Sequence, residues 1–305
     1  MKIWLTGAKG MLGRTFETRL SALPVTTIGT DIEIDISDAD DVMRFAERHG
    51  FSHIINCAAY TQVDRAEAEV ERANAVNRDA PGFIGAAAAR IGASVLHFST
   101  DYVFDGRSTE PYSEEAACAP LNSYGKSKLV GEHRLFDTLS PRSDTARRVY
   151  TVRTSWLFGD HGPNFVRTML ELMVKQEVLQ VVDDQTGRPT YCDDLVEASL
   201  ALFGLFDEKT AENPPSSGRY HFANSGATSW HGFASGILEI AREMGFSIQT
   251  KRIEPVKTSA FPRLAVRPLY SVLATDRITA VLGVTPRPWQ LAVRDYLNKI
   301  TTKIG

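Results

Sequence analysis

A tyrosine stands four residues before a lysine in the stretch YGKSK, at Tyr124 and Lys128. On a helix these two side chains share one face, whereas Lys126 points elsewhere. Tyrosine has an ordinary pKa of about 10 and is a poor acid–base catalyst at neutral pH. A neighbouring ammonium stabilises the phenolate and lowers that pKa toward a useful range. The pair is therefore a candidate for general acid–base catalysis, and the alternative is two polar residues on an exposed helix.

Hydroxyl groups precede this helix in the stretch STDYVF, where Ser99, Thr100 and Asp101 end a predicted strand. Ligands of open α/β folds bind at the carboxyl ends of the strands. A hydroxyl at this edge can hydrogen-bond a substrate carbonyl oxygen beside the tyrosine that protonates it. This position favours the catalytic interpretation of the tyrosine and lysine.

Three glycines, Gly7, Gly10 and Gly13, follow the first predicted strand with the spacing G-x-x-G-x-x-G. Glycine permits a tight turn and a close backbone approach, and the following helix presents free N–H groups and its positive dipole end. The pattern is typical of a pyrophosphate site, although three glycines also make ordinary turns.

An acid follows the second predicted strand: Asp31 lies eighteen residues after the last of these glycines. A carboxylate there can accept hydrogen bonds from an adenosine ribose, and the alternative is a solvated loop acid. Asp35 and Ile36 are candidates to flank the adenine. Asp31 repels a 2′-phosphate, and Lys9 partly offsets that repulsion. The predicted cofactor is NADH or NADPH, with Lys128 at its nicotinamide ribose.

The chain has 305 residues, and its 34 Lys and Arg against 37 Asp and Glu give a net charge of −3. This balance provides no general attraction to nucleic acid or to an anionic membrane. The first residues lack the basic and apolar regions of an export signal, and no apolar run of about 18 residues could span a bilayer. Three cysteines outside any metal or CxxC spacing favour a reduced cytoplasm; they are Cys57, Cys118 and Cys192.

Apolar, β-rich runs alternate with segments long enough for helices, which indicates an α/β fold built on a doubly wound parallel sheet. The predicted strands are Lys2–Thr6, Val25–Gly29, His53–Ala58, Ser94–Ser99 and Val149–Ser155. The predicted helices are Ala73–Ile91, Asn122–Leu139, Trp230–Gly245 and Pro288–Ile304, with a loop at Glu212–Gly218 and an irregular stretch at Pro255–Leu273.

After Trp156 the alternation weakens and the chain becomes richer in Gly, Pro and Arg. We therefore expect a smaller, mixed C-terminal lobe that binds the substrate. Residues 1–158 with about 188–222 form the predicted dinucleotide-binding domain. Residues from about 159–187 and 223–305 form the predicted substrate-binding lobe.

The combination of TGAKGMLG, NCAAYTQVD, STDYVFDG, YGKSK and RTSWLFG resembles the extended short-chain dehydrogenase/reductase superfamily. Within it, STDYVFDG, RTSW and DQTGRPT are more specifically similar to the dTDP-4-dehydrorhamnose reductase family, and the likeness covers nearly the whole chain. The resemblance implies a Rossmann-type fold and NADPH- or NADH-dependent reduction of a 4-keto group. The implied substrate is dTDP-4-dehydro-6-deoxy-L-mannose and the product dTDP-L-rhamnose, a precursor of cell-surface polysaccharide.

The same resemblance implies roles for individual residues. Thr100, Tyr124 and Lys128 become the catalytic hydroxyl, acid and lysine. The sugar is expected near Asp101 and Trp156, although Trp156 is otherwise a core residue. The cofactor is expected along Gly7, Gly10, Met11 and Leu12, and near Ala58, Ala59 and Thr61.

The sequence departs from the family at a metal site. Some members dimerise around a magnesium ion that glutamates on the first helix and near the C-terminus hold. The corresponding positions here are Thr15 and Lys299, and Asp193 is the candidate acid that remains. A lone carboxylate beside a lysine is a poor magnesium site. We therefore predict a monomer that needs no metal.

A nucleotide-diphospho-sugar carries about two negative charges, so cations must be placed locally. Arg188, Arg263 and Arg267 lie in segments expected to face the cleft, although arginines also decorate loops. His97 lies within a predicted strand and is expected to be a packed core histidine.

Two alternatives stay open. Another nucleotide-sugar reductase, epimerase or dehydratase would keep the catalytic residues and change the sugar pocket. Tyr102 follows Asp101 where a dehydratase normally has a second acid, which counts against that reaction. A regulatory subunit, similar to the reductase-like partners of methionine adenosyltransferase, would keep the fold without turnover. The intact Thr100, Tyr124 and Lys128 favour an enzyme.

Overall fold

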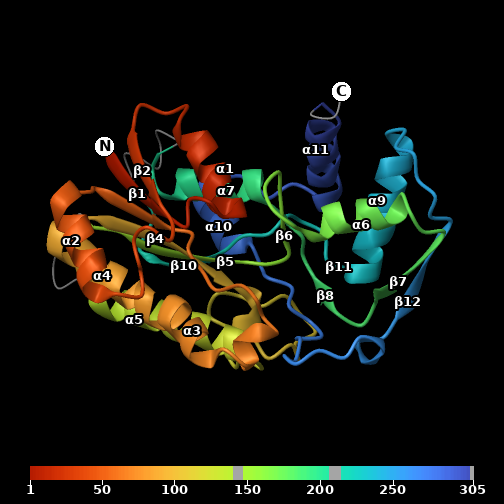
Figure 1. Cartoon of the computed structure of the whole chain (residues 1–305), viewed down its shortest axis with the longest axis horizontal. Helices are drawn as coiled ribbons and strands as arrows, with labels where there is room; N and C mark the ends of the chain where they lie inside the picture. The colour runs from red at the N-terminus through yellow and green to blue at the C-terminus, as the bar shows by residue number, and fades with distance from the viewer. Residues whose placement is uncertain (140–146, 206–213, 303–305) are drawn as a thin grey trace.

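A six-stranded parallel sheet forms the centre of the larger part of the molecule (Figure 1). The structure is a computed structural model and describes residues 1–139, 147–205 and 214–302. The strand order is β10–β5–β4–β3–β1–β2. The chain reverses its winding direction between β1 and β3, which makes the carboxyl ends of these strands the expected ligand position. The strands are β1 (Lys2–Thr6), β2 (Thr26–Thr30), β3 (His53–Asn56), β4 (Ser94–Thr100), β5 (Val149–Thr154) and β10 (Gly218–His221).

Helices cover both faces of this sheet, as the α/β prediction requires (Figure 1). Adjacent residues of a strand point to opposite faces, so Leu5 packs with α1 and α7 while Trp4 packs with α2 and α4. Both faces are therefore apolar, which is typical of a parallel sheet. On the first face lie α1 (Met11–Leu20), α7 (Cys192–Leu202) and α10 (Asp276–Leu282), and on the second α2 (Ala39–His49), α4 (Ala80–Ile91) and α5 (Ser123–Leu139).

The predicted helix Ala73–Ile91 differs from the structure, because a π-helical turn interrupts it. The chain runs from α3 (Val70–Asn74) through η2 (Ala75–Asp79) into α4. Within this turn the Asn77 side chain accepts a hydrogen bond from the Tyr60 N–H and donates one to the Tyr60 carbonyl, each at 2.9 Å. The π turn thus places an amide that fixes the segment after β3.

A smaller lobe packs around a second core (Figure 1). Phe233, Tyr296 and Met173 lie at its centre. Its elements are α6 (Phe165–Met173), β7 (Val178–Val182), α9 (Trp230–Glu243), β12 (Arg252–Val256) and α11 (Trp289–Thr302). Two short strand pairs connect it to the sheet: β6 (Leu157–Phe158) with β9 (Thr190–Tyr191), and β8 (Thr186–Gly187) with β11 (Thr228–Ser229). Separate core clusters support the predicted lobes, whose boundaries stay a prediction.

The remaining predicted elements agree with the structure within two residues at their described ends. The stretch predicted to be irregular contains the end of β12 and a 3-10 turn, η4 (Thr258–Ala260). Glu212, in the predicted loop, and Ile304, at the end of the last predicted helix, lie outside the described residues. Within the described ranges, no helix combines the length and apolar character needed to cross a membrane. The three cysteines are free thiols.

Candidate active site

The glycine loop joins β1 to α1 and fits a pyrophosphate. Gly7 has a φ of +63° and packs so closely on the segment after β3 that a Cβ there would lie 2.6 Å from the Ala58 nitrogen. The Arg14 N–H donates to the Gly10 carbonyl at 3.0 Å, so the N–H groups of Met11 and Leu12 precede the first helical hydrogen bond. No acid lies in this first turn. The helix end therefore offers donors and a positive dipole to an anion.

Close packing also explains the third glycine and the neighbouring alanines. A Cβ on Gly13 would lie 2.1 Å from the Gly7 carbonyl oxygen, so a larger residue would push α1 away from the loop. Ala58 and Ala59 follow β3 directly, and Thr61 lines the pocket described below. These residues lie where the cofactor was predicted, and their roles stay predictions.

Asp31 immediately follows β2 and is partly buried, which suits the predicted ribose contact. Lys9 does not face an open phosphate position, because its Nζ pairs with Glu33 at 3.2 Å. Both of these side chains are largely exposed, so solvent screens the pair. A 2′-phosphate would have to compete with Glu33 for Lys9.

Asp35 and Ile36, the predicted adenine neighbours, have local contacts in the structure, and their cofactor roles stay predictions. The Asp35 carboxylate accepts hydrogen bonds from the Ser37 N–H and hydroxyl, at 2.9 and 2.6 Å. These bonds hold a local turn and lower the pKa of Asp35. Ile36 is buried and belongs to the core cluster below the sheet. Asp35 thus stabilises a local turn and Ile36 packs in the core.

A cavity of about 310 Å³ lies at the carboxyl ends of β4 and β5 and brings Thr100 and Tyr124 together, whereas Lys128 does not line it. The Thr100 hydroxyl donates to the Asp101 carboxylate at 3.0 Å and accepts from the Tyr102 N–H at 3.1 Å. Tyr124 reaches the same cavity from the start of α5. The lining residues are Thr61, Val63, Ser99, Thr100, Asp101, Tyr102, Tyr124, Thr154, Ser155, Trp156, Leu157 and Trp230.

The pKa shift of Tyr124 beside Lys128 differs from the one expected from the sequence. Burial raises the pKa of Tyr124 to about 12, with the Thr100 hydroxyl acting in the opposite direction and Asp101 in the same direction. Burial also raises the pKa of Asp101 to about 6. Lys128 does not lower the tyrosine pKa overall, since its Nζ is turned to the Phe98 carbonyl at 2.6 Å. Tyr124 therefore stays protonated at neutral pH, as a proton donor must.

Trp156 forms one wall of the cavity by stacking on Trp230. Their ring centroids are 3.6 Å apart with an angle of 11° between the planes. Trp156 has a φ of 47°, in the left-handed region that favours glycine, and Trp230 donates to the Gln185 side chain at 3.2 Å. Gly187 leaves room for the stack, because a Cβ there would lie 2.7 Å from the Trp156 ring. Sequence analysis missed Trp230, which enters the site from a helix in the other lobe.

The three predicted phosphate arginines have different environments. Arg188 is partly buried and forms no ion pair among the described residues, and burial lowers its pKa. Its Nε is buried and has no hydrogen-bond partner. Arg267 instead forms a bidentate pair with Asp64, at 3.1 and 2.7 Å. Arg263 lies in an exposed loop. None of the three lines the cavity.

Comparison with known proteins decides the family of this chain. Residues 1–302 match the family described as the RmlD substrate binding domain. A dTDP-4-dehydrorhamnose reductase of Burkholderia thailandensis is 36% identical over 306 residues, which cover 98% of this chain and 100% of the relative. The chain belongs to the dTDP-4-dehydrorhamnose reductase family.

Solved structures of the family agree. A Clostridium acetobutylicum dTDP-4-dehydrorhamnose reductase has a TM-score of 0.88 and 36% identity, covering 99% of this chain and 100% of that one. The Bacillus anthracis dTDP-4-dehydrorhamnose reductase in complex with NADP has a TM-score of 0.86 and 32% identity, covering 98% and 99%. Both span essentially the whole chain, so the resemblance seen in the motifs extends through both lobes.

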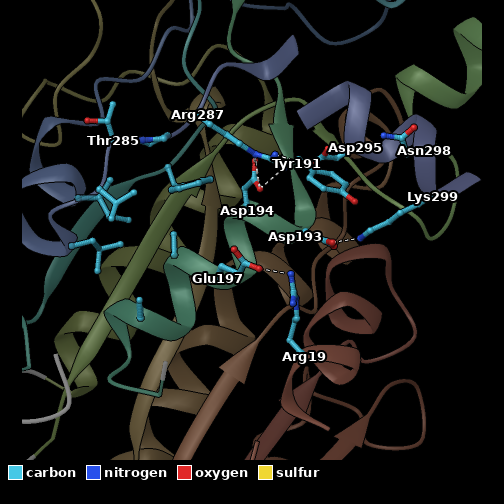
Figure 2. A pocket seen from close by; sticks show the side chains of 17 residues that line it. Arg19, Tyr191, Asp193, Asp194, Glu197, Thr285, Arg287, Asp295, Asn298 and Lys299 are labelled. Carbon is cyan, nitrogen blue, oxygen red and sulfur yellow. Dashed lines mark hydrogen bonds and ion pairs between the residues drawn. The ribbon is translucent and has the colours of Figure 1, made fainter. Parts of the chain in front are cut away.

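The positions that the resemblance relates to a metal site hold an ion pair in this chain. Figure 2 shows Lys299 of α11 directed at Asp193 of α7, with which it pairs, and Asp160 lies 3.9 Å from the same Nζ. Thr15 is buried on α1 and donates to the Met11 carbonyl at 3.0 Å. Sequence analysis missed Asp160 as a second nearby acid. Across the described ranges, no three His, Cys, Asp or Glu side chains gather as metal ligands.

The cavity beside this ion pair is larger than the catalytic one, at about 840 Å³, and lies between α1, α7, α10 and α11 (Figure 2). Its described lining contains none of the predicted catalytic, cofactor or substrate residues. Its cations are paired: Arg19 with Glu197, Arg287 with Asp194, and Lys299 with Asp193. Size therefore does not identify the reaction site, and the chemistry points to the smaller cavity.

Proposed function

We propose that this protein reduces the 4-keto group of dTDP-4-dehydro-6-deoxy-L-mannose to give dTDP-L-rhamnose. The observation that carries the proposal is the meeting of Thr100, Tyr124 and Trp156 in one cavity at the carboxyl edge of the sheet. A buried hydroxyl donor and an aromatic wall suit a sugar carbonyl. The identity of the substrate is inferred from membership of the reductase family.

Tyr124 acts as the general acid. Its pKa of about 12 keeps it protonated, and it gives its proton to the oxygen of the sugar as negative charge develops there. The Thr100 hydroxyl hydrogen-bonds the same oxygen and fixes the carbonyl. In the resting structure Asp101 accepts a hydrogen bond from the Thr100 hydroxyl, which must rotate away from Asp101 to donate to the sugar oxygen.

The nicotinamide cofactor, when bound, supplies the hydride. Gly7, Gly10, Met11 and Leu12 would hold its pyrophosphate, and Asp31 its adenosine ribose. Lys128 lies one helical turn after Tyr124 and would hydrogen-bond the nicotinamide ribose. The acid at position 31 and the pairing of Lys9 with Glu33 favour NADH, while the NADP complex of a relative supports NADPH.

The cavity of about 310 Å³ accommodates the sugar, with Trp156 as its wall. Arg188 is the candidate for the diphosphate, because its buried guanidinium has no acid partner among the described residues. Arg267 is assigned a structural role, since Asp64 already neutralises it.

The test is the loss of NADH and NADPH absorbance with purified protein and dTDP-4-dehydro-6-deoxy-L-mannose. Tyr124→Phe removes the proton donor and should lower kcat by about a hundred- to ten-thousandfold while cofactor affinity stays close to wild type. Near-normal turnover by Tyr124→Phe would refute the acid role. A control is Tyr220→Phe, which alters a tyrosine on β10 outside the cavity and should retain turnover.

The same assay separates the alternatives. Cofactor oxidation with a different nucleotide-sugar and none with this substrate would indicate another enzyme of the superfamily. Cofactor binding without oxidation of any such sugar, together with co-purification of a methionine adenosyltransferase, would indicate a regulatory subunit. We also propose a metal-independent monomer located in the cytoplasm.

A further inference from the structure

A row of polar side chains crosses the sheet directly behind the catalytic lysine. Thr6 of β1 pairs in register with Asn56 of β3, and Asn56 pairs with His97 of β4. The three side chains lie on one face because each is two residues beyond an apolar residue of the core that packs under α5. Each of them, and Lys128, is at most 2% exposed.

Hydrogen bonds connect this row without a gap. The Thr6 hydroxyl donates to the Asn56 carbonyl oxygen at 2.7 Å, and the Asn56 amide nitrogen lies 3.0 Å from Nδ1 of His97. Nε2 of His97 lies 3.5 Å from Nζ of Lys128. His97 is therefore a buried histidine, as predicted, but it also links the lysine to the sheet.

The chemistry of the ring gives this row two satisfied states. A neutral imidazole has one N–H and one lone pair, so a bond accepted at Nδ1 leaves an N–H at Nε2, and the reverse. An Nε2–H facing Lys128 suits a neutral amine, whereas an Nε2 lone pair suits an ammonium. A half-turn of the Asn56 amide exchanges its donor and acceptor, and the Thr6 hydroxyl can both donate and accept.

We propose that Thr6, Asn56 and His97, here called the polar row, form a two-state positioning device in which the tautomer of His97 follows the charge of Lys128. With the ammonium present, Nε2 accepts from Lys128 and Nδ1–H donates to the Asn56 oxygen. When Lys128 loses its proton to solvent, the ring keeps one proton, which then lies on Nε2. His97 is a positioning residue, because it acts through Lys128.

The surrounding charges make this coupling relevant near neutral pH. The titratable groups that interact with Lys128 are His97 from β4, Cys57 after β3 and Glu132 from its own helix, and Tyr124 precedes it by one turn on the same helix face. Burial lowers the pKa of Lys128 to about 8, and Glu132 and Cys57 oppose that change. Burial and the charge of Lys128 both lower the pKa of His97, so the ring itself stays neutral.

The direct test is ¹⁵N NMR of the ring nitrogens of His97 in the protein without substrate, between pH 6 and 10. The His97→Gln spectrum assigns the ring among the seven histidines. We expect a neutral ring that changes from the Nδ1–H to the Nε2–H tautomer around pH 8. One tautomer at every pH, or protonation of the ring itself, overturns the proposal. This readout needs no turnover, so it is independent of the proposed function.

Kinetic variants give a second, matched test that does rest on the proposed reduction. Glutamine places its amide near Nε2, facing Lys128, and asparagine near Nδ1, facing Asn56. The ammonium form of Lys128 is taken to hold the nicotinamide ribose, so kcat/KM should fall as pH rises through about 8. His97→Asn should move this fall to lower pH by about one to two units, and His97→Gln should leave it nearly in place. Coincident profiles for the two variants refute the proposal.

Two further variants keep the test decisive if the His97 variants do not fold. Asn56→Asp can only accept, so it should lock the Nδ1–H tautomer and move the fall in kcat/KM to higher pH. Thr151→Val is the control: Thr151 continues the same row on β5, in register with His97, and its buried hydroxyl has no hydrogen-bond partner. It should change neither readout. A tautomer change without any turnover supports the polar row and rejects the proposed function.

Discussion

Gly187 is the position where one methyl group should damage the substrate site without touching the cofactor site. A Cβ there would lie 2.7 Å from Cε2 and 2.8 Å from Cζ2 of Trp156. This is about 0.7 Å short of an ordinary van der Waals contact. Movement of the Trp156 ring is restricted, because Trp230 stacks on it with ring centroids 3.6 Å apart. Gly187→Ala must therefore shift the cavity wall or strain the short strand β8.

The expected cost follows from that geometry. Overpacking of this kind lowers the free energy of unfolding by about 1–3 kcal/mol. A shift approaching 1 Å in a wall that positions the sugar should lower kcat/KM by about ten- to hundredfold, with the dissociation constant for NADPH unchanged. Urea denaturation, steady-state kinetics and cofactor titration measure these three quantities.

The matched control is Gly218→Ala, at the start of β10, where the nearest atom to an added Cβ is the Ser216 oxygen at 4.0 Å. This change should leave kcat/KM as in wild type and affect unfolding by less than about 1 kcal/mol. Wild-type kcat/KM and stability in Gly187→Ala would show that the two tryptophan rings do not form a fixed wall, and the reasoning would be wrong.

Three further predictions concern charge. Glu132 is fully buried and accepts hydrogen bonds from Arg153 at 2.9 and 2.7 Å and from Arg219 at 2.9 Å. Glu132→Gln should therefore lower the free energy of unfolding by about 3–5 kcal/mol. A free energy of unfolding from urea denaturation within about 1 kcal/mol of wild type would contradict this. The folded-state pKa of Asp101, about 6, exceeds its ordinary value of 3.8, so the protonated form is favoured in the fold and wild type should lose stability as pH rises from about 4 to above 6. Asp101→Asn should lack that loss in thermal denaturation at several pH values, and equal pH dependence would exclude the burial effect. EDTA should change neither the elution volume in size-exclusion chromatography nor the reduction rate, and a magnesium-dependent dimer would overturn the metal-independent monomer.

Local sequence determined the parts of this protein that depend on short-range geometry. The turn at Gly7 and the donors of Met11 and Leu12 follow from backbone sterics and helix termini, which act over a few residues. Tyr124 and Lys128 share a face because a helix repeats every 3.6 residues. The alternation of strands and helices predicted the parallel sheet for the same reason: each element carries its own periodicity.

Only the tertiary structure decided which distant side chains meet. Arg267 was predicted at the phosphate, yet Asp64, far earlier in the chain, neutralises it. Trp230 reaches Trp156 from the other lobe, and strand register rather than sequence spacing aligns Asn56 with His97. The packing of whole elements determines which side chains meet in these contacts. Burial also shifts pKa values: the sequence alone predicted a lowered pKa for Tyr124, and burial raises it. The chemistry could be named from residue types, but its electrostatics came from the fold.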